Sequence, residues 1–217
     1  MNIFAINGSP RKNWNTAILL NKALEGAASH NNSNTNINTE LINLYDLEFK
    51  GCISCFYCKR KGGEHGRCAM KDELTPVLEK LNTADAIVFG SPIYFMNITS
   101  GMASLLERFL FSNMIYSIEI PTVYPRKIPT GFIYTMNVTE NQADNFGIKI
   151  NLKTYQNVLE RILGITPELL FSYNTYQFTD YKKYESSMFS EEEKAEQKVK
   201  QFPIDCENAF NMGVKLL

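Results

Sequence analysis

The chain has 217 residues, of which 44% are hydrophobic and 21% charged, and its formal net charge is -1. A chain of this length and composition is expected to fold as one domain over residues 1–217. The weak charge gives no field that attracts nucleic acid, and no apolar run reaches membrane-spanning length, so we expect neither partner. The first apolar run begins without a leader pattern, which predicts a cytoplasmic location.

Five short apolar runs with β-forming residues alternate with helical patterns along the chain. The runs are residues 3–6, 39–44, 86–90, 131–136 and 165–171. Three of them are almost continuously apolar, as in strands that helices cover on both faces, whereas residues 39–44 include Glu40 and Asn43 and suit an edge. This alternation predicts an α/β fold with a parallel sheet.

Apolar residues recur with helical spacing at residues 16–27, 100–111 and 152–163. Gly164 follows the last of these patterns and fits a C-terminal cap. Ser190 and Glu193 form a capping-box pattern that predicts another helix, and the apolar stripe after Phe202 predicts a C-terminal helix. The polar residues 30–36 are expected to form the turn before the second run.

A polar turn lies directly between the first apolar run and the first helical pattern. It reads Asn-Gly-Ser-Pro-Arg-Lys-Asn-Trp-Asn-Thr over residues 7–16. Ser9, Asn15 and Thr16 can present donors at a helix N-terminus, where free N–H groups and the helix dipole favour an anion. Arg11 can add a charge-assisted contact. The turn is neither a Walker A motif nor a dinucleotide fingerprint, so it predicts a phosphate that belongs to another class of ligand.

A second loop, residues 91–97 after the third run, reads Ser-Pro-Ile-Tyr-Phe-Met-Asn. Because ligands bind beyond the carboxyl ends of parallel strands, this loop, residues 137–141 and the turn 7–16 are expected to meet. A rigid proline turn with apolar and aromatic side chains can flank a flat heteroaromatic ring. A phosphate at one end and a planar polar ring at the other indicate FMN.

These motifs resemble those of the flavodoxin-like NAD(P)H-dependent FMN reductases, which include the iron–sulfur flavoproteins and related quinone reductases. The similarity rests on residues 8–11 with 15–16, on residues 90–95 and on the helix through residues 107–109. Trp14 departs from it, because a small residue is common there. The resemblance implies a doubly wound five-stranded parallel sheet in the order 2-1-3-4-5, with helices on both faces. The cofactor-binding residues that it implies are Ser9, Arg11, Asn15, Thr16, Pro92, Ile93, Tyr94, Phe95 and Asn97.

A cysteine loop, residues 50–70, follows the second run and is expected at the same sheet edge as the flavin. Its compact spacing favours an iron–sulfur cluster, although residues 59–67 form a longer insertion than is usual in iron–sulfur flavoproteins. The alternatives are a loop without metal over the cofactor edge, a zinc site that includes His65, and a thiol–disulfide pair. The candidate metal ligands are Cys52, Cys55, Cys58 and Cys68.

The resemblance implies an enzyme whose FMN accepts a hydride from NADH or NADPH and passes electrons to a quinone, flavin or similar small acceptor. No catalytic side chain is expected, because the flavin supplies this chemistry. An electron carrier without a dinucleotide substrate is the alternative, and a scaffold without flavin is a third. The resemblance also implies a homodimer or homotetramer. The aromatic residues 172–189, ahead of the last helices, suit either the flavin pocket or a subunit contact.

Overall fold

The computed structural model describes residues 1–31 and 36–217, so the turn expected at residues 30–36 lies mostly outside the described residues. A parallel sheet in the order β2-β1-β3-β4-β5 forms its centre. This order confirms the predicted doubly wound, flavodoxin-like fold. The strands are β1 (Asn2–Asn7), β2 (Asn38–Asn43), β3 (Ala86–Pro92), β4 (Thr130–Thr135) and β5 (Glu168–Ser172).

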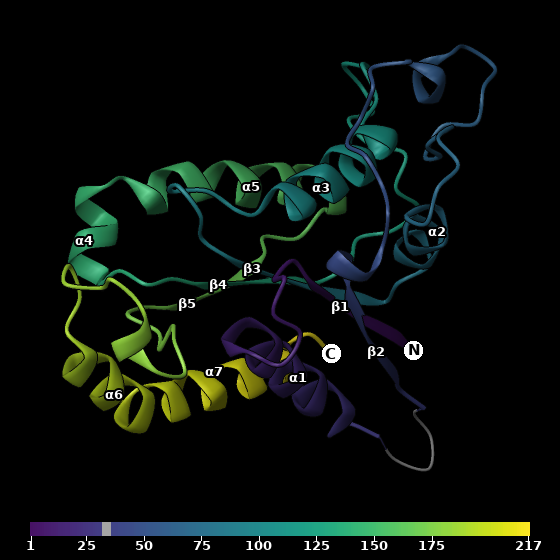
Figure 1. Cartoon of the computed structure of the whole chain (residues 1–217). Helices are drawn as coiled ribbons and strands as arrows, with labels where there is room; N and C mark the ends of the chain where they lie inside the picture. Colours follow the sequence, from purple (N-terminus) through teal and green to yellow (C-terminus); the bar gives the residue numbers. More distant parts are fainter. Residues whose placement is uncertain (32–35) are drawn as a thin grey trace.

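Helices cover both faces of the sheet, with α3 and α5 above it and α1 and α7 below it in Figure 1. No helix among the described residues is long and apolar enough to cross a membrane. The helices are α1 (Asn15–Ala28), α2 (Thr75–Asn82), α3 (Ser100–Asn113), α4 (Glu140–Asn145), α5 (Ile148–Leu163), α6 (Glu191–Lys200) and α7 (Phe202–Lys215), and short 3-10 turns occupy Leu44–Asp46, Tyr57–Lys59 and Tyr181–Lys183.

Strand β1 shows how one sheet supports two apolar cores. Phe4 and Ile6 belong to the core that includes residues of α2, α3 and α5, whereas Ile3 and Ala5 belong to the core that includes residues of α1 and α7. Successive strand side chains point to opposite faces, so an unbroken apolar run serves both cores.

The structure differs from the sequence prediction at one strand and at two short helices. Strand β5 begins at Glu168, three residues after the start of the predicted run, because Gly164 ends α5 with a left-handed φ of +81° and Pro167 has no N–H for the ladder. The short helices α2 and α4 were not predicted, although Thr139 and Gln142 form a reciprocal capping box at the start of α4.

Helices α1 and α7 cross with their backbones in contact. A Cβ on Gly213 of α7 would lie 1.8 Å from the carbonyl oxygen of Ala23, and a Cβ on Gly26 of α1 would lie 1.9 Å from that of Phe210. Only glycine permits this approach on each helix. The C-terminal helix therefore fixes the position of the helix that follows the turn 7–16.

Candidate functional site

The segments after β1, β3, β4 and β5 meet around one narrow cavity of about 90 Å³. This place is the carboxyl edge of the sheet, where ligands of doubly wound folds bind. The lining residues are Ser9, Arg11, Trp14, Asn15, Thr16, Pro92, Ile93, Tyr94, Thr135, Met136, Asn137, Thr175, Tyr176 and Gln177.

Local hydrogen bonds shape the turn 7–16. The buried side chain of Asn7 accepts from the Ser9 N–H through Oδ1 at 3.0 Å, and Ser9 Oγ accepts from the Arg11 N–H at 3.1 Å. The Gly8 N–H donates to the Gly90 carbonyl at 2.8 Å, so the turn also rests on β3. Helix α1 then begins without a side-chain cap at Trp14, which leaves its first N–H groups open to an anion.

The segment after β5 closes over this turn. Tyr176 O accepts from Trp14 Nε1 at 3.1 Å and from Asn15 Nδ2 at 2.9 Å, while Gln177 O accepts from Arg11 Nη1 at 2.6 Å. Cofactor-sized ligands occupy cavities of roughly 300–1,000 Å³. The cavity is smaller than this range, and the three contacts hold the segment after β5 over the turn.

The loop after β3 forms a tight hairpin. Tyr94 and Asn97 exchange backbone hydrogen bonds of 2.8 and 3.0 Å, and both residues between them have left-handed backbones, with φ of 47° at Phe95 and 60° at Met96. The Phe95 side chain is 99% exposed. The Asn97 side chain accepts from the hydroxyl of Tyr155 of α5 at 3.0 Å. Neither Phe95 nor Asn97 lines the cavity.

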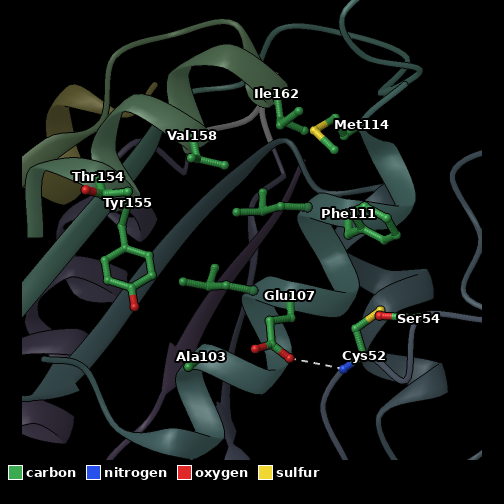
Figure 2. A pocket seen from close by; sticks show the side chains of 12 residues that line it. Cys52, Ser54, Ala103, Glu107, Phe111, Met114, Thr154, Tyr155, Val158 and Ile162 are labelled. Atoms are coloured by element: carbon green, nitrogen blue, oxygen red, sulfur yellow. Dashed lines mark hydrogen bonds between the residues drawn. The ribbon is translucent and has the colours of Figure 1, made fainter. Parts of the chain in front are cut away.

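A larger apolar cavity of about 480 Å³ lies between α3 and α5. Figure 2 shows Tyr155 and Val158 of α5 on one side of it and Glu107 and Phe111 of α3 on the other. One end of the cavity reaches the hairpin through the hydrogen bond from Tyr155 to Asn97. At its other side, Glu107 Oε2 accepts from the Cys52 N–H at 3.1 Å (Figure 2).

The cysteine loop runs along α3 and leaves the carboxyl edge of the sheet. Ahead of the loop, Tyr45 lies against Gly101, near the start of α3, and within the loop Gly51 lies against Glu107. The ring of Phe56 then meets that of Phe111 at 6.1 Å. Because α3 runs antiparallel to the strands, these contacts carry the cysteines toward the opposite edge. The loop thus begins at the predicted carboxyl edge, but its cysteines lie along α3, away from that edge.

All five cysteines are free, and Cys52, Cys55, Cys58 and Cys68 line one small cavity together with Arg108. The Arg108 side chain is fully buried and forms an ion pair with Asp72 at 2.5 Å. Its Nε has no hydrogen-bond partner among the described residues. Burial raises the pKa of Cys58, and Lys59 opposes this change. In the described part of the chain, no group of three or more His, Cys, Asp or Glu side chains is placed to hold a metal ion. The iron–sulfur cluster stays a prediction.

Comparison with known proteins decides the family. The family model described as NADPH-dependent FMN reductase matches residues 1–117, which is more than half of the chain. The chain belongs to the NADPH-dependent FMN reductase family. The matched segment contains the turn 7–16, the cysteine loop and the hairpin after β3.

Curated proteins similar to this chain include iron–sulfur flavoproteins of archaea. One from Methanocaldococcus jannaschii is 37% identical over 108 residues, which cover 50% of this chain and 51% of the relative. One from Archaeoglobus fulgidus is 39% identical over 114 residues, which cover 52% and 51%. The chain thus spans about half the length of the curated relatives it matches.

Solved structures share the fold at low identity. The NAD(P)H:quinone oxidoreductase of Methanothermobacter marburgensis aligns with a TM-score of 0.70 and 15% identity, covering 100% of this chain and 99% of its own. An azoreductase of Bacillus anthracis aligns with a TM-score of 0.68 and 13% identity, covering 99% of both chains. These likenesses support the fold of this FMN reductase family member.

In this member of the FMN reductase family, the predicted cofactor residues meet at one cavity, except for Phe95 and Asn97. The sequence interpretation missed Thr135, Thr175 and Gln177, which also line the cavity. Their signal was available, because each of them lies at or just after the carboxyl end of a predicted strand, where a doubly wound fold places its ligand.

Proposed function

We propose that this chain is an FMN-dependent oxidoreductase that takes electrons from NADH or NADPH and passes them to a quinone, flavin or similar small acceptor. The observation that carries the proposal is the cavity at the carboxyl edge. There the anion donors of the turn 7–16 meet a wall formed by Pro92, Ile93 and Tyr94. Membership of the FMN reductase family supports FMN as the ligand.

The residues present suit the two ends of FMN. Ser9 Oγ, the Arg11 guanidinium and the uncapped start of α1 suit a phosphate. Asn137 lines the same cavity, and its Oδ1 is buried without a hydrogen-bond partner among the described residues. A buried acceptor of this kind is costly unless a donor meets it, and the ring and ribityl chain of FMN carry such donors.

When bound, FMN supplies hydride acceptance and electron delivery. The protein binds and orients it: the turn 7–16 holds the phosphate end, and Pro92 to Tyr94 support the ring. The backbone oxygens of Tyr176 and Gln177, which accept from Asn15 and Arg11, border the cavity beside this turn. We assign no side chain as a proton donor or acceptor for the hydride step.

The apolar cavity between α3 and α5 suits the acceptor. Its lining is mostly aliphatic and aromatic, so it favours an uncharged ring such as a quinone. The Glu107 carboxylate disfavours the phosphates of a dinucleotide there. The hydrogen bond between Tyr155 and Asn97 ties this cavity to the hairpin of the flavin site.

Anaerobic reduction tests this function. The full chain is loaded with FMN, mixed with NADH or NADPH, and then mixed with menadione while the flavin absorbance is followed. We expect bleaching by one dinucleotide and rapid recovery with the quinone. Reduction only by a separate reductase would instead identify a carrier. A colourless protein that fails to bind added FMN would contradict both functions.

A second candidate is an iron–sulfur flavoprotein that carries electrons without a dinucleotide substrate. Two observations favour it: the relatives described above are named iron–sulfur flavoproteins, and four thiols line one cavity beside the buried Arg108. Iron and sulfide counts and an electron-spin spectrum of anaerobically purified protein test it. Stoichiometric iron that Cys58→Ser abolishes would support the cluster, and flavin bands alone would exclude it.

We also propose that the chain forms a homodimer or homotetramer. Ile118 is fully exposed, and Tyr116 and Ile150 are more than two-thirds exposed, on segments next to the apolar cavity. Exposed apolar side chains of this size are available for a contact between subunits. Light scattering during gel filtration measures the mass, and a single-chain mass at micromolar concentration would contradict this assembly.

A further inference from the structure

Helix α6 buries a lysine. The helix reads Glu-Glu-Glu-Lys-Ala-Glu-Gln-Lys-Val-Lys, and Lys194 is its buried residue, with 1% exposure. Lysine is seldom buried, because removing an ammonium group from water is costly unless a carboxylate compensates it. No carboxylate among the described residues forms an ion pair with Lys194. Its partners are neutral oxygens.

The ammonium group of Lys194 joins two loops at the carboxyl edge of the sheet. Its Nζ donates to the Asn137 carbonyl at 2.7 Å and to Asn174 Oδ1 at 2.8 Å, and it lies 5.0 Å from the centre of the Phe189 ring. Asn137 follows β4 and Asn174 follows β5. Helix α6 therefore places a cation where the two strands end.

This cation lacks compensation within its surroundings. The groups packed against it from other segments, Asn137, Asn174 and Phe189, carry no charge. The adjacent Glu193 on α6 is the carboxylate that acts on it. Burial lowers the pKa of Lys194 to about 8, and Glu193 raises it in part. At neutral pH the side chain is therefore mostly protonated, so a positively charged ammonium group is buried there.

The position of Lys194 connects this charge to the flavin cavity. Asn137, which accepts from Lys194, lines the cavity and has the unpartnered Oδ1. Thr175, next to Asn174, also lines it, and its N–H and hydroxyl both donate to Met136 O, at 2.9 and 3.1 Å. Lys194 thus stands directly behind the wall that the β4 and β5 loops form.

We propose that Lys194 is a positioning and charge-compensating residue of the FMN site. Its ammonium group holds Asn137 and Asn174 in place, and its field stabilises the phosphate of bound FMN. A phosphate monoester carries about 1.5 to 2 negative charges at neutral pH, and it is the charged group of oxidised FMN. This inference rests on the proposed function, because it needs FMN in the cavity.

The test compares FMN with riboflavin, which has the same ring and ribityl chain without the phosphate. Both are titrated into the full chain, and flavin fluorescence gives the dissociation constants for wild type, Lys194→Met and Lys194→Arg. We expect Lys194→Met to weaken FMN roughly tenfold and riboflavin much less, and Lys194→Arg to keep most of the FMN affinity. The matched control is Lys200→Met, which removes an exposed lysine from the same helix.

A pH series separates charge from shape. Wild-type affinity for FMN should fall as the pH rises through about 8, because Lys194 loses its proton, and Lys194→Met should lose this dependence. Equal weakening of riboflavin and FMN would show a merely structural tether and overturn the proposal. Unchanged FMN affinity in Lys194→Met would also overturn it. If the wild type binds neither flavin, the proposed function fails as well.

Discussion

The turn 7–16 and the cysteine loop both follow strands, yet different forces hold them. Within the turn, Asn7, Ser9 and Arg11 hydrogen-bond to residues two positions away, and Gly8 bonds to the neighbouring strand. The cysteine loop instead depends on α3, through the Cys52 N–H on Glu107 and the Lys50 carbonyl on Arg108. A motif held by hydrogen bonds between near neighbours keeps its shape in any fold that supplies its strand and helix. The position of a loop held by distant residues depends instead on those residues.

Removing the long-range anchor should have the largest effect. Arg108→Met leaves Asp72 without its partner and frees the Lys50 and Met70 carbonyls. We expect a loss of about 3 kcal/mol in the free energy of unfolding, measured with urea, because one half of a buried ion pair is removed. Arg67→Met, which breaks an exposed pair on the same loop, serves as the control. Equal unfolding midpoints for the two variants would contradict the anchoring role.

The packing of α7 against α1, which supports the turn 7–16, can be disrupted by a substitution in α7. Gly213→Ala places a methyl group 1.8 Å from the Ala23 carbonyl oxygen, so α1 and α7 must separate. We expect a loss of about 2 kcal/mol, measured by thermal unfolding, together with weaker FMN binding. Gly62→Ala is a control in the cysteine loop, because nothing lies within 4 Å of its Cβ position. The backbone of Gly62 is left-handed, so the Gly62→Ala variant measures the cost of backbone strain without a steric clash. A Gly213→Ala protein as stable as wild type would argue against the close crossing.

The two regions should respond separately to loss of a polar atom. Ser9→Ala removes the oxygen that accepts from the Arg11 N–H and that suits a phosphate. We expect FMN affinity, measured by fluorescence titration, to fall roughly tenfold. Cys55→Ser, in the other region, should leave that affinity unchanged. Weakening by both variants would mean that the cysteine loop does reach the flavin.

The smallest expected effect compares two left-handed phenylalanines. Phe95→Gly relieves backbone strain at φ 47° and loses little packing, because the side chain is 99% exposed, so stability should rise by about 1 kcal/mol. Phe56→Gly relieves similar strain at φ 55° but loses the ring contact with Phe111. The Phe56→Gly variant should therefore be no more stable than the wild type. Thermal unfolding of both variants checks this, and equal gains would show that Phe56 contributes no packing.

The sequence predicted the parts of the molecule that short segments encode. The apolar runs predicted the parallel sheet, and the family resemblance implied its strand order. The turn 7–16 and Pro92 to Tyr94 were expected at the edge where the structure has them. These features depend on patterns of a few residues, such as a proline turn or a free helix start. Phe95 was expected inside, but the φ values of a tight hairpin turn it outward.

Contacts between segments far apart in the chain could not be predicted from the sequence patterns. The path of the cysteine loop depends on Glu107 and Arg108, more than fifty residues away. Lys194 lies in a helix so polar that every pattern indicates a solvated face, and only the meeting of the β4 and β5 loops buries it. No periodicity marks such a residue, because its burial comes from two strands elsewhere in the chain.

The glycine crossing of α1 and α7 also sets an order in time. A ribosome releases the turn 7–16 and α1 early, but α7 follows more than 170 residues later. At about 5–20 residues per second, this delay is on the order of ten seconds or more. During synthesis, the apolar face of α1 therefore stays exposed until α7 has been made, and the turn 7–16, although made early, gains the support of α7 only at the end.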